Sequence, residues 1–499
     1  MAEEDTEIVK QLKKLKEAKT NISSAIVEKG GTLPTAFVDY GDAIRELPAG
    51  VETVPDIEFM DYDGTTVATY TFEEANALTA LPALPEREGF VNQGWNYGLQ
   101  DVKNAASVGL KTLVGCTYIT DDGVNRFHIS ITEPNETFTF NFVQTKTASV
   151  RLDWGDGVWD VPGGTGKRYR EHTYATPGEY TITVSANQTN PPTLNFDWSI
   201  CSACAEDCRK IQSIDLGRSN IISNNTFRYC DEVTEISFPI TPSSVYSYGT
   251  GCADGMIGIE AFVVPSGMTS VKPYMFQNCA SLKKVSIPPS VTAIESYAFR
   301  GCASLENMRI PASVEVFQDH CFEDCGKLKK IYGEIKGELG YGAFRNCHQL
   351  NDLNISFSNF DSSTFYHCTS LTSVDPGTPI TRMGTSANSD GMFDSCVNLK
   401  YVSEIETDII QKFAFRDCIS LSAVKIKDSG GKLLICDSAF RNSGITVFDF
   451  SECSVIPTLA SNVFYNHTND MTILVPAASA SVWKDASNWS SFKNYIKGV

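Results

Sequence analysis

The 499-residue sequence predicts a multidomain, mainly β protein, in which an N-terminal helix, a small β unit and a β-sandwich precede a long solenoid. A phrase of the form Phe-x-x-Cys-x-x-Leu recurs in the second half of the chain, mostly every 21 to 25 residues. Repeats of this length are the signature of solenoids. Residues 54–196 alternate apolar and polar side chains between short turns, as strands do. The first 30 residues show a helical period, and a short helical patch follows at Phe37–Ile44.

Residues 1–30 are predicted to form a helix with an apolar seam. The seam positions are spaced alternately by four and three residues, with Lys19 in the same register, as in a coiled coil. Gly30 and Gly31 end the pattern. We expect the helix to make the chain oligomeric, with a trimer favoured, or to attach it to a partner; packing of the helix on its own chain stays open. The seam comprises Ile8, Leu12, Leu15, Ile22 and Ile26.

Residues 31–53 are interpreted as a short attachment module followed by a linker. The stretch from Ala25 to Leu47 resembles short N-terminal modules of phage tail proteins and other virion-associated proteins of gut bacteria. The resemblance implies attachment to a virion, with other virion proteins as partners. Leu47-Pro48-Ala49-Gly50 has the composition of a linker.

Residues 54–114 are predicted to form a small β-rich unit. Strands are expected at Ile57–Met60 and Val67–Tyr70, on either side of an Asp63-Gly64 turn. The later residues Pro85, Arg87, Gly89-Phe90 and Gly94-Trp95 resemble the end of the Listeria–Bacteroides repeat. That resemblance implies a β-grasp-like spacer, so we expect a stalk element here.

Residues 115–196 are predicted to form a β-sandwich. Phe138–Phe142, Ser149–Leu152 and Tyr180–Val184 alternate with period two. The turn Asp153–Gly157 and the segment His172–Tyr174 complete a pattern that resembles a PKD-type immunoglobulin-like domain. The resemblance implies a non-catalytic domain.

Asp153 and Asp156 could contribute oxygen ligands to calcium, which requires six to eight of them. Two carboxylates on one turn are too few. A hydrogen-bonded turn is therefore the favoured interpretation, and no metal is expected.

Residues 197–475 are predicted to form the solenoid. In one unit, Val285–Ile287 and Val291–Ile294 give two short inward-facing segments, and Tyr297-Ala298-Phe299 leads into a turn that carries Cys302. Such units bury a core only by stacking on one another. The long step between two early copies predicts a degenerate unit around Cys252. The expected core ladder is Phe276, Cys279, Phe299, Cys302, Phe322, Cys325, Phe344, Cys347, Phe365, Cys368, Phe393, Cys396, Phe415 and Cys418.

This repeated sequence pattern resembles the BspA-type leucine-rich repeat, in which Ile-Pro-x-Ser-Val is followed by Ala-Phe-x-x-Cys-x-Ser-Leu. Residues 476–499 resemble the closing cap of such arrays, with Trp483 where that family has tyrosine. The resemblance implies a fold and an interaction role more than any chemistry. Since loops carry function, the polar insert Thr378–Asp390 is the expected place of ligand contact.

Eight of the 16 cysteines occupy the same position in successive repeats, which predicts a buried ladder of free thiols made in a reducing cytosol. Cys201, Cys204 and Cys208 lie outside this register. Zinc binding, a local disulfide and packing at the entry of the solenoid stay open for them.

The formal charge of −19 argues against nucleic acid as a partner, because phosphate binding needs a basic surface. No apolar run long enough for a membrane span is present. The acidic start Met1–Asp5 precedes no apolar segment, so we expect no signal peptide.

No nucleophile elbow, phosphate-binding loop, zinc-protease helix or dinucleotide fingerprint occurs in the sequence, and no cofactor is expected. The resulting hypothesis is a non-enzymatic phage virion protein, a tail fibre, baseplate or head-fibre component. It would be made in the host cytoplasm, be exposed on the particle and bind a host-surface glycan, protein or mucus through the solenoid. The alternatives are a bacterial or protist cell-surface adhesin and a virion-associated enzyme that degrades polysaccharide.

Overall fold

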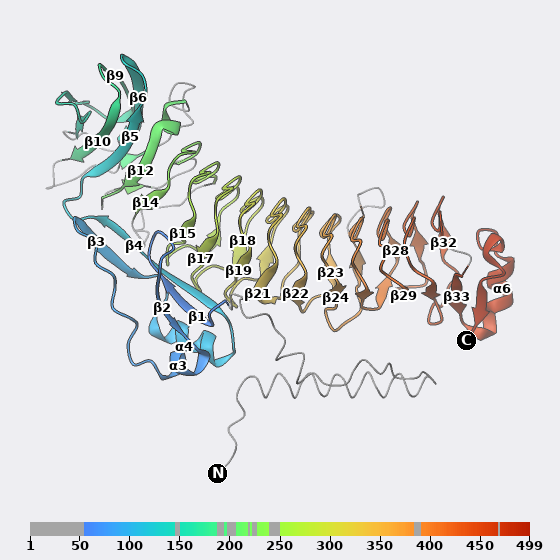
Figure 1. The fold of residues 1–499 in the computed structure, drawn as a ribbon. Coiled ribbons are helices and arrows are strands. Elements are labelled where there is room, and N and C mark those ends of the chain that lie inside the picture. Colours follow the sequence, from blue (N-terminus) through green and yellow to red (C-terminus); the bar gives the residue numbers. More distant parts are fainter. Residues whose placement is uncertain are drawn as a thin grey trace, which may run out of the picture. The chain divides into compact units, whose positions relative to one another are not determined.

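The computed structural model describes residues 54–144, 150–186, 194–196, 206–217, 220–221, 227–238, 250–383, 391–467 and 470–499 (Figure 1). The expected N-terminal helix and the module at residues 31–53 lie outside these residues. The predicted seam of Ile8, Leu12, Leu15, Ile22 and Ile26 lies there too. All that follows concerns the compact unit Pro55–Val499.

The small β unit is built on a four-stranded sheet in the order β2-β1-β4-β3. The two strands expected from the sequence are confirmed, and the Asp63-Gly64 turn joins them, with Gly64 at a φ of 88°. β1 runs antiparallel to β2 and parallel to β4. The strands are β1 (Ile57–Met60), β2 (Thr66–Tyr70), β3 (Phe90–Trp95) and β4 (Thr112–Thr120).

Two helices of this unit were not predicted, α3 (Phe72–Ala77) and α4 (Leu99–Ser107). Both are too short for a hydrophobic period to be read in the sequence. The N-terminal cap of α3 can nevertheless be recognised in the sequence as Thr71 followed by Glu74. The Thr71 hydroxyl accepts a hydrogen bond from Glu74 N at 3.2 Å, and the Glu74 carboxylate accepts one from Thr71 N. The apolar faces of both helices share a core with β1.

β4 also corrects the expected end of the unit. The strand runs without a break from Thr112 to Thr120, so the predicted boundary after residue 114 falls inside it. All nine of its residues are buried; β1 pairs with Thr112–Gly115 and β3 pairs with the segment Cys116–Thr120. The β unit therefore includes residues that the sequence analysis assigned to the sandwich.

The sandwich has two sheets, in the orders β14-β12-β5-β10-β7-β8 and β13-β11-β6-β9. The structure confirms strands over the three segments expected, as far as their residues are described. The strands are β5 (Asn125–Ile131), β6 (Glu136–Gln144), β7 (Val150–Asp153), β8 (Trp159–Asp160), β9 (Gly166–Tyr174), β10 (Gly178–Ala186), β11 (Leu194–Asn195), β12 (Ile211–Asp215), β13 (Asn220–Ile221) and β14 (Glu235–Ser237).

The first sheet continues from the sandwich into the solenoid. β12 pairs antiparallel with β5, placing Ile214 opposite Phe127, and β14 then adds parallel to β12 as the rungs of the solenoid do. A single hydrophobic core runs from Phe127 to Ile496. The expected boundary between residues 196 and 197 therefore separates two sequence patterns but not two cores.

Most rungs of the solenoid contribute two short strands, which form two parallel rows along its length (Figure 1). The first row holds β15 (Ala261–Val263), β17 (Lys284–Ser286), β19 (Asn307–Arg309), β21 (Lys330–Ile335), β22 (Asp352–Ile355), β24 (Ser373–Val374), β26 (Tyr401–Val402), β27 (Ile405–Thr407), β29 (Ala423–Asp428), β31 (Val447–Asp449) and β33 (Thr472–Val475). The second row holds β16 (Ser270–Val271), β18 (Ala293–Ile294), β20 (Val316–Phe317), β23 (Asn359–Phe360), β25 (Arg382–Met383), β28 (Ile409–Ile410), β30 (Leu434–Ile435) and β32 (Thr458–Leu459).

Every residue of the expected Phe and Cys ladder is fully buried between these rows. The phenylalanine rings stack from rung to rung, as Phe299 does on Phe322 with centroids 5.2 Å apart and planes 5° from parallel. Each cysteine thiol donates to a carbonyl of the preceding rung, as Cys302 does to Phe276 O at 3.2 Å. The repeated phrase thus supplies both the packing and the hydrogen bonds between rungs.

The degenerate unit around Cys252 is confirmed. Ala253 N donates to Met275 O at 3.0 Å and its carbonyl accepts from the Cys279 thiol at 3.1 Å. Ala253 therefore stands where the other units have phenylalanine.

The C-terminal segment closes the open end of the stack. It comprises α6 (Ala480–Asp485) and β34 (Ile496–Gly498), which adds to β33. Trp483 and Trp489 are buried against Phe450, and Trp489 Nε1 donates to Pro457 O at 2.7 Å. Exposed apolar rung edges are covered in this way.

None of the helices in the described part of the chain has both the length and the apolar character that a membrane crossing requires.

The small β unit packs on the solenoid, which corrects its expected role as a spacer. Glu58, 5% exposed, forms ion pairs with Arg309 Nη1 at 2.8 Å and Lys284 Nζ at 2.9 Å. Burial alone would raise the pKa of Glu58. The hydrogen bond from Lys284 and the positive charge of Arg309 outweigh burial and hold this pKa below its ordinary value.

Buried hydrogen bonds complete this interface. Asn96 Nδ2 donates to Ser286 Oγ at 2.9 Å, and Ser286 Oγ donates to Leu113 O at 2.7 Å. Gly115 permits the close approach, because a Cβ there would lie 2.6 Å from a methyl group of Val263. A stalk element would need little contact with its neighbour, whereas this unit is fixed to the side of the rungs.

Candidate functional site

The second row of strands has an outward face whose side chains differ from rung to rung. The inward residues Ile294, Phe317, Leu339, Phe360 and Met383 are all buried and apolar. The residues immediately before them are at least partly exposed and chemically unlike one another; they are Ala293, Val316, Glu338, Asn359 and Arg382. The side chains on this face therefore differ in charge and polarity from rung to rung, whereas those in the core do not.

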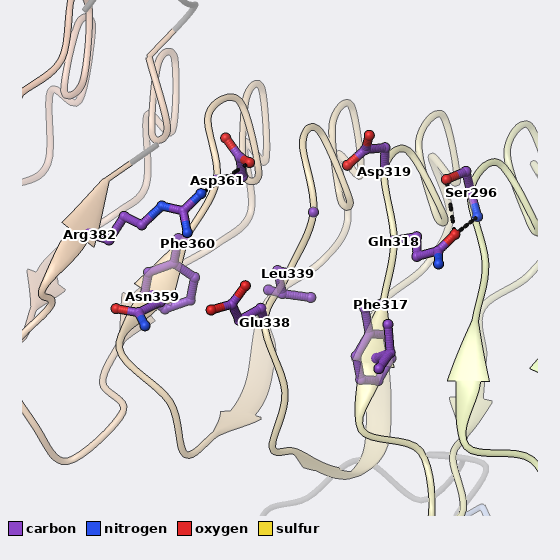
Figure 2. Close-up of a pocket in the computed structure, with 12 residues that line it drawn as sticks. Ser296, Phe317, Gln318, Asp319, Glu338, Leu339, Asn359, Phe360, Asp361 and Arg382 are labelled. Atoms are coloured by element: carbon purple, nitrogen blue, oxygen red, sulfur yellow. Dashed lines mark hydrogen bonds and ion pairs between the residues drawn. The ribbon is translucent and has the colours of Figure 1, made fainter. Parts of the chain in front are cut away.

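A cavity of about 300 Å³ lies on this face, and we call it the notch (Figure 2). Its lining includes Phe317, Leu339 and Phe360, each only 1% exposed. The rest of the lining, which we call the rim, is polar apart from Val316 and Gly340; it is formed by Ser296, Val316, Gln318, Asp319, Glu338, Gly340, Asn359, Asp361 and Arg382.

The notch forms because two successive rungs are shorter than their neighbours. In each rung we count the residues from the inward position of the first row to the inward position of the second row. This distance along the chain is nine residues from Met308 to Phe317 and eight residues from Ile331 to Leu339. In the next rung it is only seven, from Leu353 to Phe360. The shortened rung makes only isolated bridges at Leu339, to Phe317 on one side and Phe360 on the other.

Gly340 is required in this shortened rung. A Cβ there would lie 2.6 Å from the backbone nitrogen of Asp319, closer than any side chain tolerates. Glycine also leaves the space between Gln318 and Asp361 unfilled, since those residues occupy the same position in the adjacent rungs. One residue therefore allows the close approach of the rungs and opens the cavity.

Carboxylates dominate the rim. Asp361 is paired with Arg382 at 3.6 Å, and Asp319 Oδ1 accepts from Tyr341 N at 2.9 Å. Glu338 is exposed, and its carboxylate makes no hydrogen bond or ion pair with any residue of the described chain. Figure 2 shows Glu338 on the rung between those of Asp319 and Asp361. The notch thus holds three carboxylates against one guanidinium.

Both rim amides already accept hydrogen bonds, Asn359 Oδ1 from Thr381 Oγ1 at 2.6 Å. Gln318 Oε1 accepts from Ser296 N at 3.1 Å and from Ser296 Oγ at 3.2 Å (Figure 2). This contact ties two rungs together and fixes one wall of the notch.

A row of aromatic side chains borders the notch, and the sequence analysis missed it. Tyr274, Tyr297, His320 and Tyr341 follow one another on successive rungs, with ring centroids 4.9, 4.8 and 5.0 Å apart. The signal in the sequence was a tyrosine or histidine two residues before the phenylalanine of the repeat, or three before it in the case of Tyr341. The first three rings lie within 14° of parallel, so they cover one another's faces and present edges to the solvent.

The other residues predicted to form sites are brought together only in part. Of the insert Thr378–Asp390, residues 384–390 lie outside the described residues, and Thr378 O accepts from Ser403 Oγ at 3.2 Å. Cys201 and Cys204 are also outside them, while Cys208 is buried and donates to Tyr229 O at 3.3 Å. Where the chain is described, no three His, Cys, Asp or Glu side chains converge as a metal site would require.

In the sandwich, the hydrogen-bonded interpretation of the turn at residues 153–157 is confirmed. Asp153 Oδ1 accepts from Gly155 N, and Asp156 Oδ1 accepts from Val158 N, both at 3.1 Å. Asp156 Oδ2 lies 2.7 Å from His172 Nε2. Although burial opposes it, these contacts hold the pKa of Asp156 below its ordinary value. The carboxylates thus stabilise the turn itself.

Family comparisons agree with this architecture. A model described as the BspA type leucine rich repeat region, with six copies, matches residues 198–283, 331–406 and 386–494, which together cover half of the chain. A PKD domain model matches residues 127–192. No curated protein matches the chain.

The chain is also similar to solved bacterial leucine-rich repeat proteins. One from Bacteroides ovatus is 22% identical over 56% of this chain and 75% of its own, with a TM-score of 0.40. A leucine rich cell surface protein from Faecalibacterium prausnitzii is 23% identical over 51% and 68%, with a TM-score of 0.32. One from Eubacterium ventriosum is 14% identical over 62% and 96%, with a TM-score of 0.29.

Proposed function

Because the chain belongs to the BspA-type leucine-rich repeat family and includes a PKD domain, we propose that it is a non-enzymatic adhesion protein. Its solenoid binds a ligand on a cell surface or in mucus through the outward face of the second row of strands. The sandwich and the docked β unit form a base that is continuous with the first rungs.

One observation carries this proposal. The core positions repeat the same residues in unit after unit, because stacking demands identical partners. The outward positions of the second row change from Val316 to Glu338, Asn359 and Arg382 over four rungs. A face that varies on an invariant scaffold is suited to recognising one particular ligand, and the notch lies on that face.

We propose that the protein is carried on the surface of a phage virion. Residues 1–53 would attach it to other virion proteins and to two further copies of the same chain. The resemblance of the N-terminal segment to virion-associated modules supports this carrier. Fourteen described cysteines are free and buried, which suits synthesis in a reducing cytosol. The alternative carrier is the surface of a bacterial cell.

A binding assay tests the proposed function. Fluorescently labelled full-length protein is added to a panel of gut bacteria and to mucin-coated beads, beside a variant that carries Val316→Lys and Asn359→Lys. We expect saturable binding to at least one surface and at least a tenfold loss in the variant. Glu306→Lys, exposed outside the notch, is the matched control. Absence of saturable binding on every surface would overturn the proposal.

Two further readouts separate the alternatives. An antibody against the solenoid labels purified particles if the carrier is a virion, and labels intact bacteria if it is a cell. Release of reducing ends from surface polysaccharide during the assay would instead favour the degradative enzyme.

A further inference from the structure

The last rung of the solenoid leaves backbone donors without acceptors. In earlier rungs, N–H groups in the turn around the repeat phenylalanine donate to carbonyl oxygens of the following rung, as Ser438 N does to Ser461 O at 3.0 Å. The equivalent donors of the last rung are Asn462 N, Phe464 N and Asn466 N. None of the three donates to another residue in the described part of the chain. Backbone N–H groups form strong hydrogen bonds, so these donors are open to an acceptor from a ligand.

The last turn has the same backbone conformation as the turn of the preceding rung. The φ angle of Asn462 is 55°, as is that of Ser438. The φ angle of Asn466 is 62°, against 54° for Asn442. The N–H groups of the last rung therefore point along the stack, away from the preceding rung. The C-terminal segment, which closes the stack, lies on that side.

A cavity of about 420 Å³ lies between this turn and the C-terminal segment, and we call it the end cavity. Asn462 and Phe464 line it from the last rung. Ser487 and Phe492 line it from the C-terminal segment. Its volume is within the range of small-molecule sites, about 300 to 1,000 Å³, and it shares no lining residue with the notch. The turn with open donors therefore has room for a ligand in front of it.

The lining of the end cavity is neutral. Among the described residues that form it, none is an Asp, Glu, Lys, Arg or His. Leu459 and Phe492 are partly exposed, so the cavity offers some apolar surface. Its hydroxyl and amide side chains, which both donate and accept hydrogen bonds, belong to Asn462, Ser487, Asn488 and Ser491. Asn488 Nδ2 donates to Leu459 O at 3.4 Å, while the other three side chains make no hydrogen bond within the described chain.

Tyr465 adds an aromatic ring to the lining, and this residue is 54% exposed. Arg441 covers one face of the ring, with Cζ 4.9 Å from the ring centroid. The exposed part of the ring can pack against the C–H groups of a sugar ring.

An anion is poorly suited to the end cavity. An ionised carboxylate or phosphate would lose water there without a cation in the described lining to replace it. The net charge of −19 also repels anions. A neutral carbonyl suits the open N–H donors better, because it is the group that their equivalents bond to in a following rung. A whole further rung of peptide does not fit, since the C-terminal segment already lies against the turn.

We infer that the end cavity binds the acetamido group of an N-acetylated amino sugar. The acetamido carbonyl oxygen accepts from Asn462 N, as Ser461 O accepts from Ser438 N. The acetyl methyl group lies on Leu459 and Phe492, and the sugar hydroxyls bond to the neutral polar side chains of the lining. The inference goes beyond the proposed function, because it concerns the end of the stack and not the outward face of the second row.

Small glycosides test the inference directly. The probes are the methyl glycosides of N-acetylglucosamine and N-acetylgalactosamine, beside those of glucose and galactose, which lack the acetamido group. Binding to the full-length protein is measured by saturation-transfer NMR. We expect at least one acetamido sugar to bind, with the strongest transfer at its acetyl methyl protons, and its counterpart to bind at least about fivefold more weakly. Raising sodium chloride from about 20 mM to about 300 mM should leave this binding unchanged, because the ligand is neutral.

A backbone amide signal reports the contact itself. The protein is produced with isotopically labelled asparagine, and the amide signal of Asn462 is identified by its loss in Asn462→Gly. Glycine suits the positive φ at this position, so the variant should keep the turn. The Asn462 amide proton should move downfield when the acetamido sugar is added, and should stay in place with the glucose or galactose glycoside.

Variants locate the site. Ser491→Tyr fills the end cavity and should abolish binding. Tyr465→Ala removes the exposed ring and should weaken binding by about three- to fivefold. The matched controls are Ser481→Tyr, at an exposed position of α6 outside the lining, and Tyr401→Ala, whose side chain is 51% exposed on another rung. Both controls should bind as the original protein does.

Equal binding of the glucose and galactose glycosides, no binding of either acetamido sugar, or unchanged binding in both Ser491→Tyr and Tyr465→Ala would each overturn the inference. Displacement of the sugar by acetate would indicate an anion site, and displacement by acetylglycine amide a site for any amide carbonyl; either result also overturns it. These outcomes are separate from the surface-binding assay, in which Val316→Lys with Asn359→Lys tests the outward face.

Discussion

His467 Nε2 donates a hydrogen bond to the carbonyl oxygen of Phe440 at 2.7 Å. In six earlier rungs a cysteine thiol donates to the equivalent phenylalanine carbonyl, at 3.0 to 3.2 Å. The imidazole therefore replaces the thiol without loss of the bond between rungs. Unlike the thiol, it can gain a proton near neutral pH.

This replacement predicts that the C-terminal end of the solenoid weakens in acid. Burial lowers the pKa of His467, although the bonds to Phe440 and Ile445 partly oppose it. The unfolded chain then binds a proton more readily than the folded chain, so stability is complete above pH 6.5, the ordinary pKa, and falls below it. Hydrogen exchange of residues 471–499, corrected for intrinsic rates, should show less protection at pH 5.5 than at 7.5.

His467→Cys is the matched variant for this test, because it restores the repeat residue and cannot be protonated. Its protection factors should be the same at both pH values. A variant with the same pH dependence as the original protein would show that another group is responsible.

The cysteine ladder predicts unreactive thiols. Burial raises the pKa of Cys252 and Cys453 to about 12, and the thiolate is the reactive form. In the folded protein at pH 8, the fourteen described cysteines should resist iodoacetamide, and all should react in guanidinium chloride. Mass spectrometry of peptides distinguishes the sites. Alkylation of Cys302 or Cys325 in the folded protein would contradict the packing described.

The ion cluster between the β unit and the solenoid predicts a large effect of a single substitution. Glu58→Ala leaves Arg309, whose side chain is 9% exposed, as a buried charge without its closest partner. We expect a loss of about 3 kcal/mol in the free energy of unfolding, and earlier proteolysis of residues 55–110.

Glu306→Ala is the control, since it breaks an exposed pair with Lys329 and should cost at most about 1 kcal/mol. Replacing both members of the buried pair, with Glu58→Gln and Arg309→Met, should cost less than Glu58→Ala alone. If Glu58→Ala and the control behave alike, the unit is held by its apolar contacts.

The N-terminal seam predicts the assembly state. Light scattering should give a trimer for the full-length protein and a monomer for residues 54–499. Leu12→Asp with Leu15→Asp in the full chain should also give a monomer, because charges at seam positions oppose coiled-coil packing. Monomers in every case would indicate that the helix attaches to a partner or packs on its own chain.

The repeat by itself determined the solenoid, its core ladder and the degenerate unit at Cys252. It could do so because inward positions recur at a fixed period and each rung contacts only its neighbours. Strands of the sandwich, such as β6 and β10, were equally readable from alternation over adjacent residues.

Only the tertiary structure decided where the modules meet and where a ligand can enter. Asn96 and Ser286 are 190 residues apart and bond because two surfaces are complementary, which no local pattern encodes. β4 continues past the predicted boundary because β3 pairs with its second half, from Cys116 to Thr120. The notch depends on the lengths of three rungs and on the absence of one side chain at Gly340. Local periodicity identifies the side chains that are buried in the core. The contacts between the modules and the position of the notch depend on segments that are distant in the sequence.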